Sequence, residues 1–341
     1  MLRIGRCPAG EIDDVVRFIS EHWKPGHILT TCRPLLDWQY RDADGKGYAF
    51  IVARRSSDHS VLGILGYIET RRFDRSIQAA NVIWLTTWKV REDAAVSGLG
   101  IQLLQHLTQT TPHQAIGAVG LTPSTLPIYR ALGYAVGELQ HYVRPNRLAE
   151  RFELATIHSA SRPSEPPAAA ESDSRRLVTD EDFDSFQLVS AVTSIPVKGR
   201  EYFRQRYVHH PVYRYIVEAV SGPQGVVALL AARVVEHAAR RALRIVDFAG
   251  PAEAFARVGS VVDSMLEEFD AEYADVYNAG IPAHVFAQAG FLPVDPDGSD
   301  IVPDHFEPFE RRNVRLWYAI KGAAAPVIFK GDGDQDRPNR V

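Results

Sequence analysis

The feature that most constrains the fold of this chain is an internal repeat, because one order of helices and strands is predicted twice, about 150 residues apart. The repeat is clearest where YRALGYAV (129–136) is compared with FAQAGFLP (286–293). Each segment begins with an aromatic residue, and five residues later a second aromatic residue follows a glycine. Solenoid repeats recur every ~20 to 50 residues. The spacing therefore indicates two similar domains, each long enough to bury its own core.

Turn-forming residues and apolar periodicity define the elements of each half. The β-rich runs YAFIVARR and VLGILGYIETRRF flank the turn SSDHS and predict a hairpin, and NVIWLTTWKV predicts a third strand. The helix GIQLLQHLTQ, an apolar strand and the short helix TLPIYRALGY follow, and the second half repeats this order up to VRLWYAIK. The sequence predicts an α+β (α/β/α) fold of two tandem domains, each a mixed, largely antiparallel sheet flanked by helices.

Composition breaks once inside the chain, at ELATIHSASRPSEPPAAAESDSRR, where Pro, Ser and Ala replace any helical or strand period. We therefore expect a domain over residues 1–150, a linker over 151–176, a second domain over 177–322 and a tail over 323–341. The tail contains GDGDQDRPN, which lacks the bidentate Glu of a calcium loop, so no metal is expected. This tail is either solvated or a strap over the functional site.

Charge and cysteine content exclude several classes. The 341 residues carry a formal net charge of -4 and Lys and Arg do not cluster, which argues against a nucleic-acid partner. Cys7 and Cys32 are too few for a disulfide framework or a thiolate zinc site. The first residues turn acidic where a signal peptide needs an apolar core, and no run reaches the ~18 apolar residues of a membrane span. We expect a soluble protein of the reducing cytoplasm, with its oligomeric state open.

The loop in WKVREDAAVSGLGIQLLQHL (88–107) joins a strand that ends at Val90 to a helix that opens near Gly100. Backbone N–H groups of such a loop and first helical turn lack intrahelical partners, the helix dipole is positive there, and glycines let a bulky anion approach. The loop has neither the GK[ST] of a Walker loop nor the third glycine of a dinucleotide-binding fingerprint. It predicts a phosphate site, unless the glycines serve only the turn.

With this loop and TLPIYRALGY, residues 1–150 resemble a GCN5-related N-acetyltransferase (GNAT) domain. The family's loop runs from a strand-terminal Val through Arg/Gln-x-x-Gly-x-Gly/Ala; here Ala95, Gly98 and Gly100 follow Val90 at those distances, so the leading Arg or Gln is lost. The resemblance implies that the backbone of Trp88, Lys89 and Val90 pairs with the pantetheine arm of coenzyme A. It also implies that the pyrophosphate is held by the amides of Val96, Ser97, Gly98, Leu99, Gly100 and Ile101.

Further residues acquire roles from the same resemblance. Tyr129 stands where related enzymes place a tyrosine that protonates the departing thiolate, although it could equally be a core residue with a satisfied hydroxyl. Thr122 and Thr125 replace the family's usual Asn and Ala, so a contact to the cofactor is either absent or made by the hydroxyl of Thr122. In the second half, Phe286 replaces the tyrosine and GPAEAF replaces the glycine loop. The second half is therefore read as a degenerate repeat that closes the substrate site or supports the fold.

Attack by an amine on a thioester needs the neutral amine, so a base or a water relay is expected near the start of the central strand. NVIWLTTWKV offers no carboxylate, and Glu69 on the adjacent strand is the best candidate, ahead of Asp37 and His27. Glu69 could instead only pair with Arg71 or Arg72 at the surface.

The segment HWKPGHILTTCRPLLDWQY supplies the predicted acceptor-binding residues His27, Asp37, Trp38 and Tyr40, since aromatic residues with scattered polar groups suit a sugar ring or a nucleotide. Trp38 and Tyr40 could equally belong to the core. Together with RYVHHPVYRY and the tail, this segment is similar to tandem GNAT-type proteins found among bacterial surface-polysaccharide biosynthesis genes. That resemblance implies an amino sugar, possibly nucleotide-linked, as the acceptor.

The sequence therefore predicts an acyl-CoA-dependent N-acyltransferase that uses acetyl-CoA or another acyl-CoA and a small acceptor with a free amine, by direct attack on the thioester. Two alternatives stay open. One is a tRNA-dependent aminoacyl transferase of the tandem-GNAT type, which the mild acidity of the chain disfavours. The other is a non-catalytic protein that binds CoA or a sugar.

Overall fold

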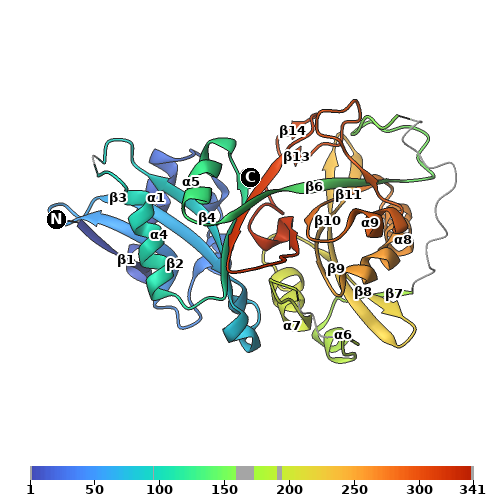
Figure 1. Ribbon diagram of the computed structural model, residues 1–341, viewed down its shortest axis with the longest axis horizontal. Helices are drawn as coiled ribbons and strands as arrows, with labels where there is room; N and C mark the ends of the chain where they lie inside the picture. Colours follow the sequence, from blue (N-terminus) through green and yellow to red (C-terminus); the bar gives the residue numbers. More distant parts are fainter. Residues whose placement is uncertain (1, 95, 159–172, 190–193, 339–341) are drawn as a thin grey trace.

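The computed structural model describes residues 2–94, 96–158, 173–189 and 194–338. Within these residues, 14 strands form one continuous sheet that runs through both halves of the molecule (Figure 1). A separate two-stranded ribbon is formed by β13 (His305–Phe306) and β14 (Phe309–Glu310). The predicted α+β fold with a mixed sheet flanked by helices is confirmed.

The first half contributes five strands that lie side by side in sequence order. They are β1 (Leu2–Pro8), β2 (Gly47–Arg55), β3 (Val61–Glu69), β4 (Val82–Val90) and β5 (Ala115–Leu121). The first four pair antiparallel, and β4 and β5 pair in parallel because the helix α4 (Leu99–Thr110) connects them as a crossover. Every residue of β2 and β3 except the last is buried, so this part of the sheet is covered on both faces.

The second half repeats this arrangement strand for strand. Its strands are β7 (Ser174–Arg176), β8 (Ile216–Gly222), β9 (Gly225–His237), β10 (Arg240–Ala249) and β11 (Ala271–Ala279). Again the first four pair antiparallel and the last two pair in parallel, across the helix α8 (Val258–Glu268). The internal repeat seen in the sequence is thus a repeat of structure.

The two halves exchange their final strands. Strand β6 (Ala135–Pro145) follows the first half in sequence but pairs with β11, and Figure 1 shows it crossing from one half to the other. Strand β15 (Leu316–Lys321) follows the second half but lies between β5 and β6. Two short strands extend the pairing: β12 (Leu292–Pro293) on β6 and β16 (Ile328–Phe329) on β11. Each half therefore completes the sheet of the other, so the halves share backbone hydrogen bonds.

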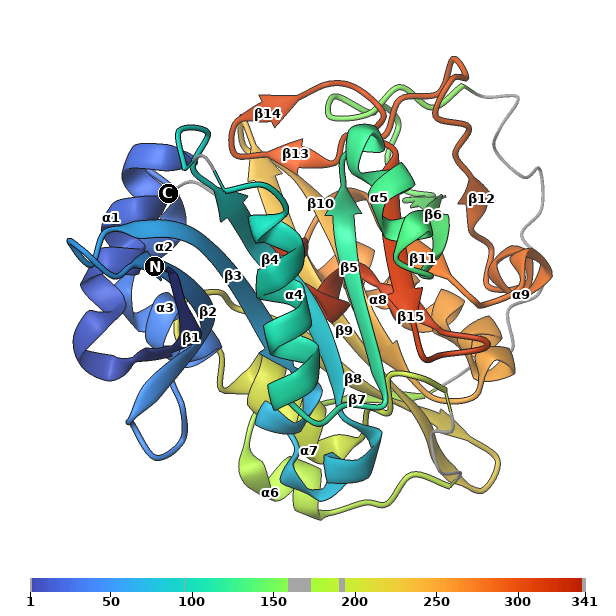
Figure 2. The same cartoon turned by 60° about the vertical axis from the view of Figure 1, so that its left-hand side comes forward.

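Helices cover the sheet, and Figure 2 shows α4 lying beside β4. In α4 the residues Leu99, Leu103, Leu104 and Leu107 are buried, as the spacing of its apolar residues predicts. The other α-helices are α1 (Ile12–His22), α2 (Ile28–Thr31), α3 (Arg33–Tyr40), α5 (Leu126–Ala131), α6 (Asp180–Asp184), α7 (Arg200–Phe203) and α9 (Ala283–Gln288).

Short helical turns link these elements. Those of the 3-10 type are η1 (Ala9–Glu11), η2 (Thr70–Arg72), η3 (Arg75–Ala80), η4 (Pro123–Thr125), η7 (Ala252–Arg257) and η8 (Lys330–Asp332). One π-helical turn, η6, spans Arg204–Val208.

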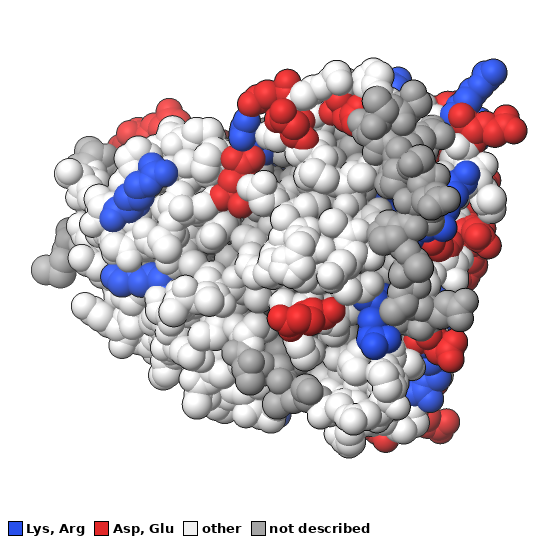
Figure 3. Space-filling view, turned by 45° about the vertical axis from the view of Figure 1, so that its right-hand side comes forward, with Lys and Arg blue, Asp and Glu red and all other residues white. Residues whose placement is uncertain are grey.

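No helix in the described part of the chain is both long and apolar enough to span a bilayer. On the face shown in Figure 3, Lys and Arg are scattered among Asp and Glu, and most of the described surface carries neither.

The core and the tail tie the halves together. The largest apolar cluster fills the first half and continues into Phe203 and Tyr207 of the second. Of the predicted linker, residues 159–172 lie outside the described residues, whereas Leu154 is buried and donates its N–H to Glu272 of the second half. Within the described part of the tail, the segment from Ile328 to Arg337 is not solvated, since Lys330, Asp332, Asp336 and Arg337 are almost fully buried. A solvated tail is therefore not what the structure shows for this segment, which packs between the two halves.

Candidate functional site

The site begins where β4 and β5 separate. Their parallel ladder runs only from Val82 opposite Ala115 to Leu85 opposite Ala118. Beyond this point β4 continues to pair with β3, and β5 continues to pair with β15. The two strands therefore open into a wedge, and among the described residues no strand pairs with the edge of β4 that faces this wedge from Thr86 onward.

A β-bulge sits at the mouth of the wedge. Leu65 of β3 pairs with Trp88 and Tyr67 pairs with Leu85, so Thr86 and Thr87 together face Gly66. A Cβ on Gly66 would lie 2.7 Å from the Phe50 ring and 3.0 Å from the Thr86 hydroxyl, so only glycine fits there. A bulge redirects the side chains of its strand. Here Thr86 lines the wedge.

The wedge holds a cavity of about 720 Å³. The cavity brings together most of the predicted cofactor residues and Tyr129. Those that line it are Trp88, Val90, Val96, Gly98, Leu99, Gly100, Ile101, Thr122 and Tyr129. Lys89 and Ser97 do not line it: the Lys89 ammonium lies 3.3 Å from the Glu92 carboxylate, and Ser97 is exposed.

The glycine loop forms the N-terminus of α4. Gly98 is the N-cap with φ 71°, a left-handed conformation that favours glycine. The first helical hydrogen bond runs from the Gln102 N–H to the Gly98 carbonyl, so the preceding N–H groups have no partner within the helix. A Cβ on Gly100 would lie 3.3 Å from the Trp88 indole nitrogen, which packs the loop against β4. Ala95, where the family's Arg or Gln would stand, lies outside the described residues.

Tyr129 of α5 stands on the opposite wall. The residue is 4% exposed, and its ring meets those of Trp88 and Tyr134 edge-on, with centroids 6.1 and 5.2 Å away. Within the described residues its hydroxyl has no hydrogen-bond partner. Burial, with a smaller effect of Tyr134, raises the pKa of this phenol above its usual value. Tyr129 is therefore protonated at neutral pH, with a proton to donate into the cavity.

The structure does not bring Glu69 to this cavity. Glu69 pairs with Ile83, near the start of β4, whereas the wedge opens toward Val90 at the other end. The Glu69 carboxylate forms an ion pair with Arg71, with Oε2 2.6 Å from Arg71 Nε, and Oε2 also accepts from Asn81 Nδ2 at 3.0 Å. The pairing with Arg71 that the sequence left as an alternative is therefore present.

Two of the predicted acceptor residues lie away from the cavity. Asp37 accepts from Arg33 Nε at 2.9 Å and from the Tyr48 hydroxyl at 2.6 Å. The ring of Trp38 packs against Phe73 and His210 with centroids 5.2 and 4.2 Å apart, at the contact between the halves. Neither side chain lines the cavity.

The other two, Tyr40 and His27, do not line the cavity but contact residues that do, and for His27 this residue is Trp23, whose ring stacks on the imidazole with centroids 5.0 Å apart. The Tyr40 hydroxyl is 2.9 Å from the hydroxyl of Thr86, so Tyr40 supports a residue of the cavity wall from behind. His27 is buried, and its Nδ1 accepts the Leu29 N–H at 3.2 Å. Burial, with Arg337 and Lys24 nearby, lowers the pKa of His27 to about 4. His27 is therefore neutral at physiological pH.

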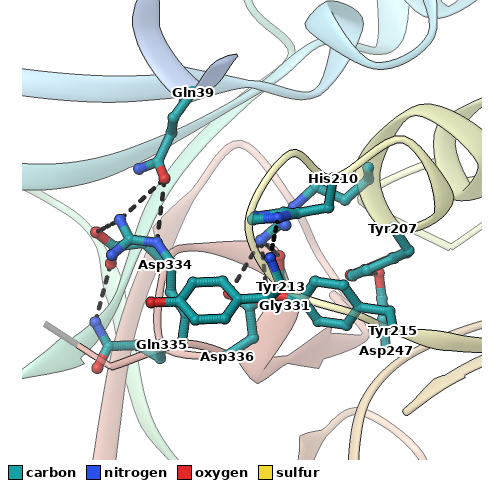
Figure 4. A network of polar contacts seen from close by, with 12 residues as sticks. Gln39, Tyr207, His210, Tyr213, Tyr215, Asp247, Gly331, Asp334, Gln335 and Asp336 are labelled. Atoms are coloured by element: carbon teal, nitrogen blue, oxygen red, sulfur yellow. Dashed lines mark hydrogen bonds and ion pairs between the residues drawn. The ribbon is translucent and has the colours of Figure 1, made fainter. Parts of the chain in front are cut away.

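The tail supplies two lining residues that the sequence analysis did not name, Asp334 and Gln335. Figure 4 shows both on the loop that Gln39 approaches from the first half. Asp334 Oδ1 accepts from Gln335 Nε2 at 3.0 Å, and its Oδ2 lies 3.4 Å from Arg337 Nη2. Among the described residues that line the cavity, Asp334 carries its one carboxylate.

Buried polar contacts hold the tail in this position. Asp336 accepts from Arg206 Nη2 at 3.0 Å and from the Tyr215 hydroxyl at 2.6 Å. Arg337 Nη2 donates to Gln39 Oε1 at 2.9 Å, which ties the tail to α3. The remaining anchors are the buried ion pairs of Lys330 with Asp304 and of Asp332 with Lys198. These contacts, of which Figure 4 shows those around Gln39 and Asp336, fix the position of Asp334.

The second half has the corresponding wedge, but the tail fills it. The parallel ladder of β10 and β11 ends at Ile245 opposite Val276, and β16 then pairs with β11. The following turn η8 packs on β10: a Cβ on Gly331 would lie 2.9 Å from the Val246 carbonyl and would also meet the Tyr207 hydroxyl. In place of a glycine loop, η7 precedes α8. Phe286, the counterpart of Tyr129, is buried against Tyr142 with ring centroids 3.9 Å apart.

The sheet has two similar halves, each with a parallel strand pair that opens into a wedge beside a helix N-terminus, as in a tandem GNAT-type fold. No family model and no curated protein matches the chain. Among solved structures, N-myristoyltransferase from Saccharomyces cerevisiae with bound myristoyl-CoA is similar, with a TM-score of 0.50, 11% identity, and coverage of 95% of this chain and 83% of that one.

Two GCN5-related N-acetyltransferases are similar as well. The protein from Anabaena variabilis gives a TM-score of 0.52 at 12% identity, over 94% of this chain and 72% of that one. The protein from Kribbella flavida gives 0.50 at 14% identity, over 94% and 70%. At these identities the likeness establishes the fold.

Proposed function

We propose that this chain is an acyl-CoA-dependent N-acyltransferase with its site in the wedge of the first half. One observation carries the proposal: the open wedge joins an unpaired strand edge, a glycine-capped helix N-terminus and a tyrosine hydroxyl without a partner in a single cavity. The similar solved proteins, which include one with bound myristoyl-CoA, support the same class of reaction.

The residues present fit a coenzyme A thioester. The N–H groups at Gly98 to Ile101 suit a pyrophosphate, because they are unpaired and the helix dipole is positive there. The free edge of β4 over Trp88 to Val90 suits the two amides of a pantetheine arm, which would add to the sheet as a further strand does. The apolar side chains of Leu85, Ala118 and Val119 suit the acyl end.

Tyr129 and Asp334 then serve the two proton transfers of the reaction, Tyr129 as the donor and Asp334 as the acceptor. The amine nitrogen attacks the thioester carbonyl, the new C–N bond forms and the C–S bond breaks. Tyr129 gives its proton to the departing sulfur, while a carboxylate accepts the extra proton of the attacking amine. We assign the second role to Asp334, because it lines the cavity and Glu69 does not. Glu69 stays the candidate if the amine is deprotonated through water.

The finer assignments rest on the sequence. We propose acetyl-CoA as the donor, a small amine such as an amino sugar or a nucleotide-linked amino sugar as the acceptor, and the cytoplasm as the compartment. For the second half we propose a supporting role, since its wedge is occupied by β16 and η8 of the same chain.

Two measurements test the proposal. Acetyl-CoA should raise the melting temperature of the protein, and thiol release in the presence of amino sugars should follow. Tyr129→Phe should lower turnover by about 10²-fold or more, the range for loss of a general acid. Tyr134→Phe is the matched control, because this neighbouring buried tyrosine does not line the cavity. Absence of any shift with acetyl-CoA or longer acyl-CoAs would refute the proposal.

A further inference from the structure

A second cavity, of about 340 Å³, adjoins the first. Gln335 lines both cavities, so the tail loop forms the wall between them. The second cavity lies at the contact of the two halves: Lys24 comes from the loop after α1, Arg233 comes from β9, and the tail contributes Asp336 and Arg337. Its lining is rich in charged side chains, unlike the wedge.

The acidic groups of this second cavity are mostly neutralised by the protein itself. Asp304 pairs with Lys330 and with Arg244. Asp336 pairs with Arg206, and Glu310 pairs with Arg312 at 2.7 Å. Glu307 is exposed. The carboxylates that point inward therefore contribute little uncompensated negative charge.

Two cations of the lining are left without such partners. Within the described residues, neither Lys24 nor Arg233 has a carboxylate oxygen within 4.0 Å. Arg233 is nevertheless held in place: its guanidinium carbon is 4.3 Å from the centre of the Tyr213 ring, and Nη1 donates to the Asp336 carbonyl at 3.2 Å. A guanidinium fixed on an aromatic face keeps its remaining N–H groups available for a carboxylate or a phosphate.

Burial, and to a smaller extent nearby cations, lowers the pKa of two neighbouring histidines. Burial lowers the pKa of His210 to about 3, with Arg206 as the next cause and Arg337 and Arg233 contributing. His27 is lowered in the same way, by burial and then by Arg337 and Lys24. Both rings are therefore neutral near pH 7, and an anion entering the cavity would meet Lys24 and Arg233 as its charged partners.

We propose that the second cavity binds an anionic group of the acceptor, a carboxylate or a phosphate, on Lys24 and Arg233. The amine of the same molecule then lies across Gln335, at the wedge that carries Tyr129 and Asp334. The acceptor class is thus an amine that bears an anion. The statement that the anion belongs to an acceptor rests on the proposed acyltransferase function. The anion site itself does not depend on that function.

The test compares the wild-type protein with the double variant Lys24→Gln/Arg233→Gln. Melting temperature is recorded as chloride is replaced by inorganic phosphate, or by acetate, at constant ionic strength. The protein is first saturated with CoA, so that the N-terminus of α4 is already occupied. Phosphate or acetate should bind the double variant at least about tenfold more weakly, since each lost ion-pair hydrogen bond weakens binding by roughly that factor. Phosphate and acetate together distinguish a phosphorylated acceptor from a carboxylated one.

Arg3→Gln is the matched control, because Arg3 is an exposed arginine on β1 that lines neither cavity. Equal binding of both anions by the wild-type protein and the double variant, or no binding of either anion by the wild-type protein, would overturn the inference. The shift with acetyl-CoA separates the two proposals. If the double variant keeps that shift but loses the anion, both proposals stand. If neither protein responds to acetyl-CoA while anion binding still differs between them, the acyltransferase proposal fails and the anion site remains.

Discussion

Replacing Asp336 by alanine should strongly destabilise the protein, because this carboxylate is the partner of a buried charge. The Asp336 side chain is fully buried and accepts from Arg206 Nη2 and from the Tyr215 hydroxyl. Arg206 has one further polar contact, a long one of 3.4 Å to the Gly331 carbonyl, and its Nη1 has no partner in the described structure. Alanine at 336 would leave a buried guanidinium without its counter-ion.

The size of the effect follows from these contacts. Breaking a buried pair from one side costs about 3 to 5 kcal/mol. Arg206 would keep the faces of Trp38 and Tyr207, 5.2 and 5.1 Å from its guanidinium carbon, and such contacts are worth about 0.5 to 2 kcal/mol. We therefore expect a loss near the lower end, about 3 kcal/mol in the free energy of unfolding.

Urea denaturation measures this loss directly, with Asp44→Ala as the control, because Asp44 forms only a solvent-exposed pair with Lys46, which contributes little to stability. The double variant Arg206→Met/Asp336→Ala removes both charges and should be more stable than Asp336→Ala alone. If Asp336→Ala costs no more than Asp44→Ala, or if adding Arg206→Met destabilises the protein further, the tail is not held by this pair.

Three further predictions follow from the tail and the wedge. Asp334→Asn should lower the rate of thiol release by about 10²-fold or more while acetyl-CoA binding persists, and Glu69→Gln should leave the rate nearly unchanged; the reverse result would make Glu69 the base. Gly331→Ala should cost about 1 to 3 kcal/mol in urea, because its Cβ would meet the Val246 carbonyl, whereas Gly10→Ala, with open space around it, should cost little; equal costs would contradict a filled second wedge. Burial alone would raise the pKa of Asp336, but Arg206 and Tyr215 hold this pKa below its usual value. The stability that Asp336 provides is therefore present above the pKa of this carboxyl in the unfolded chain, and it is lost as pH falls through the lower pKa of the folded state. The free energy of unfolding, measured as a function of pH in acid, should depend less on pH in Asp336→Ala than in the wild-type protein.

Local sequence was enough to predict several residues that line the cavity of the first half. Gly98 and Gly100 predict a helix N-terminus, because glycine is favoured where the backbone turns into a helix. Tyr129 lies further along the same half of the sequence and lines the same cavity. Such features depend on neighbours in sequence, so a single chain can reveal them. The strands of the two similar halves were predictable for the same reason, since apolar periodicity within each half defines them.

The remaining parts depend on contacts between distant segments. Glu69 lies on the strand next to β4, as predicted, but the antiparallel register places it opposite Ile83 rather than near Val90. Asp334 reaches the wedge only because Lys330, Asp332 and Asp336 find buried partners in other elements. Likewise, the sequence shows that β6 and β15 are strands, yet nothing local tells which half each one joins.

The most direct test of the account is the stoichiometry of acetyl-CoA binding, measured by isothermal titration calorimetry. The account predicts one site per chain, because the wedge of the first half is open and that of the second is filled by β16 and η8. Ile101→Glu should weaken this binding at least about tenfold, since Ile101 is 38% exposed in the first turn of α4 and a carboxylate there repels a pyrophosphate. Gln109→Glu, the same charge change at the far end of α4, should not. Two sites per chain, no binding, or equal effects of the two variants would contradict the account.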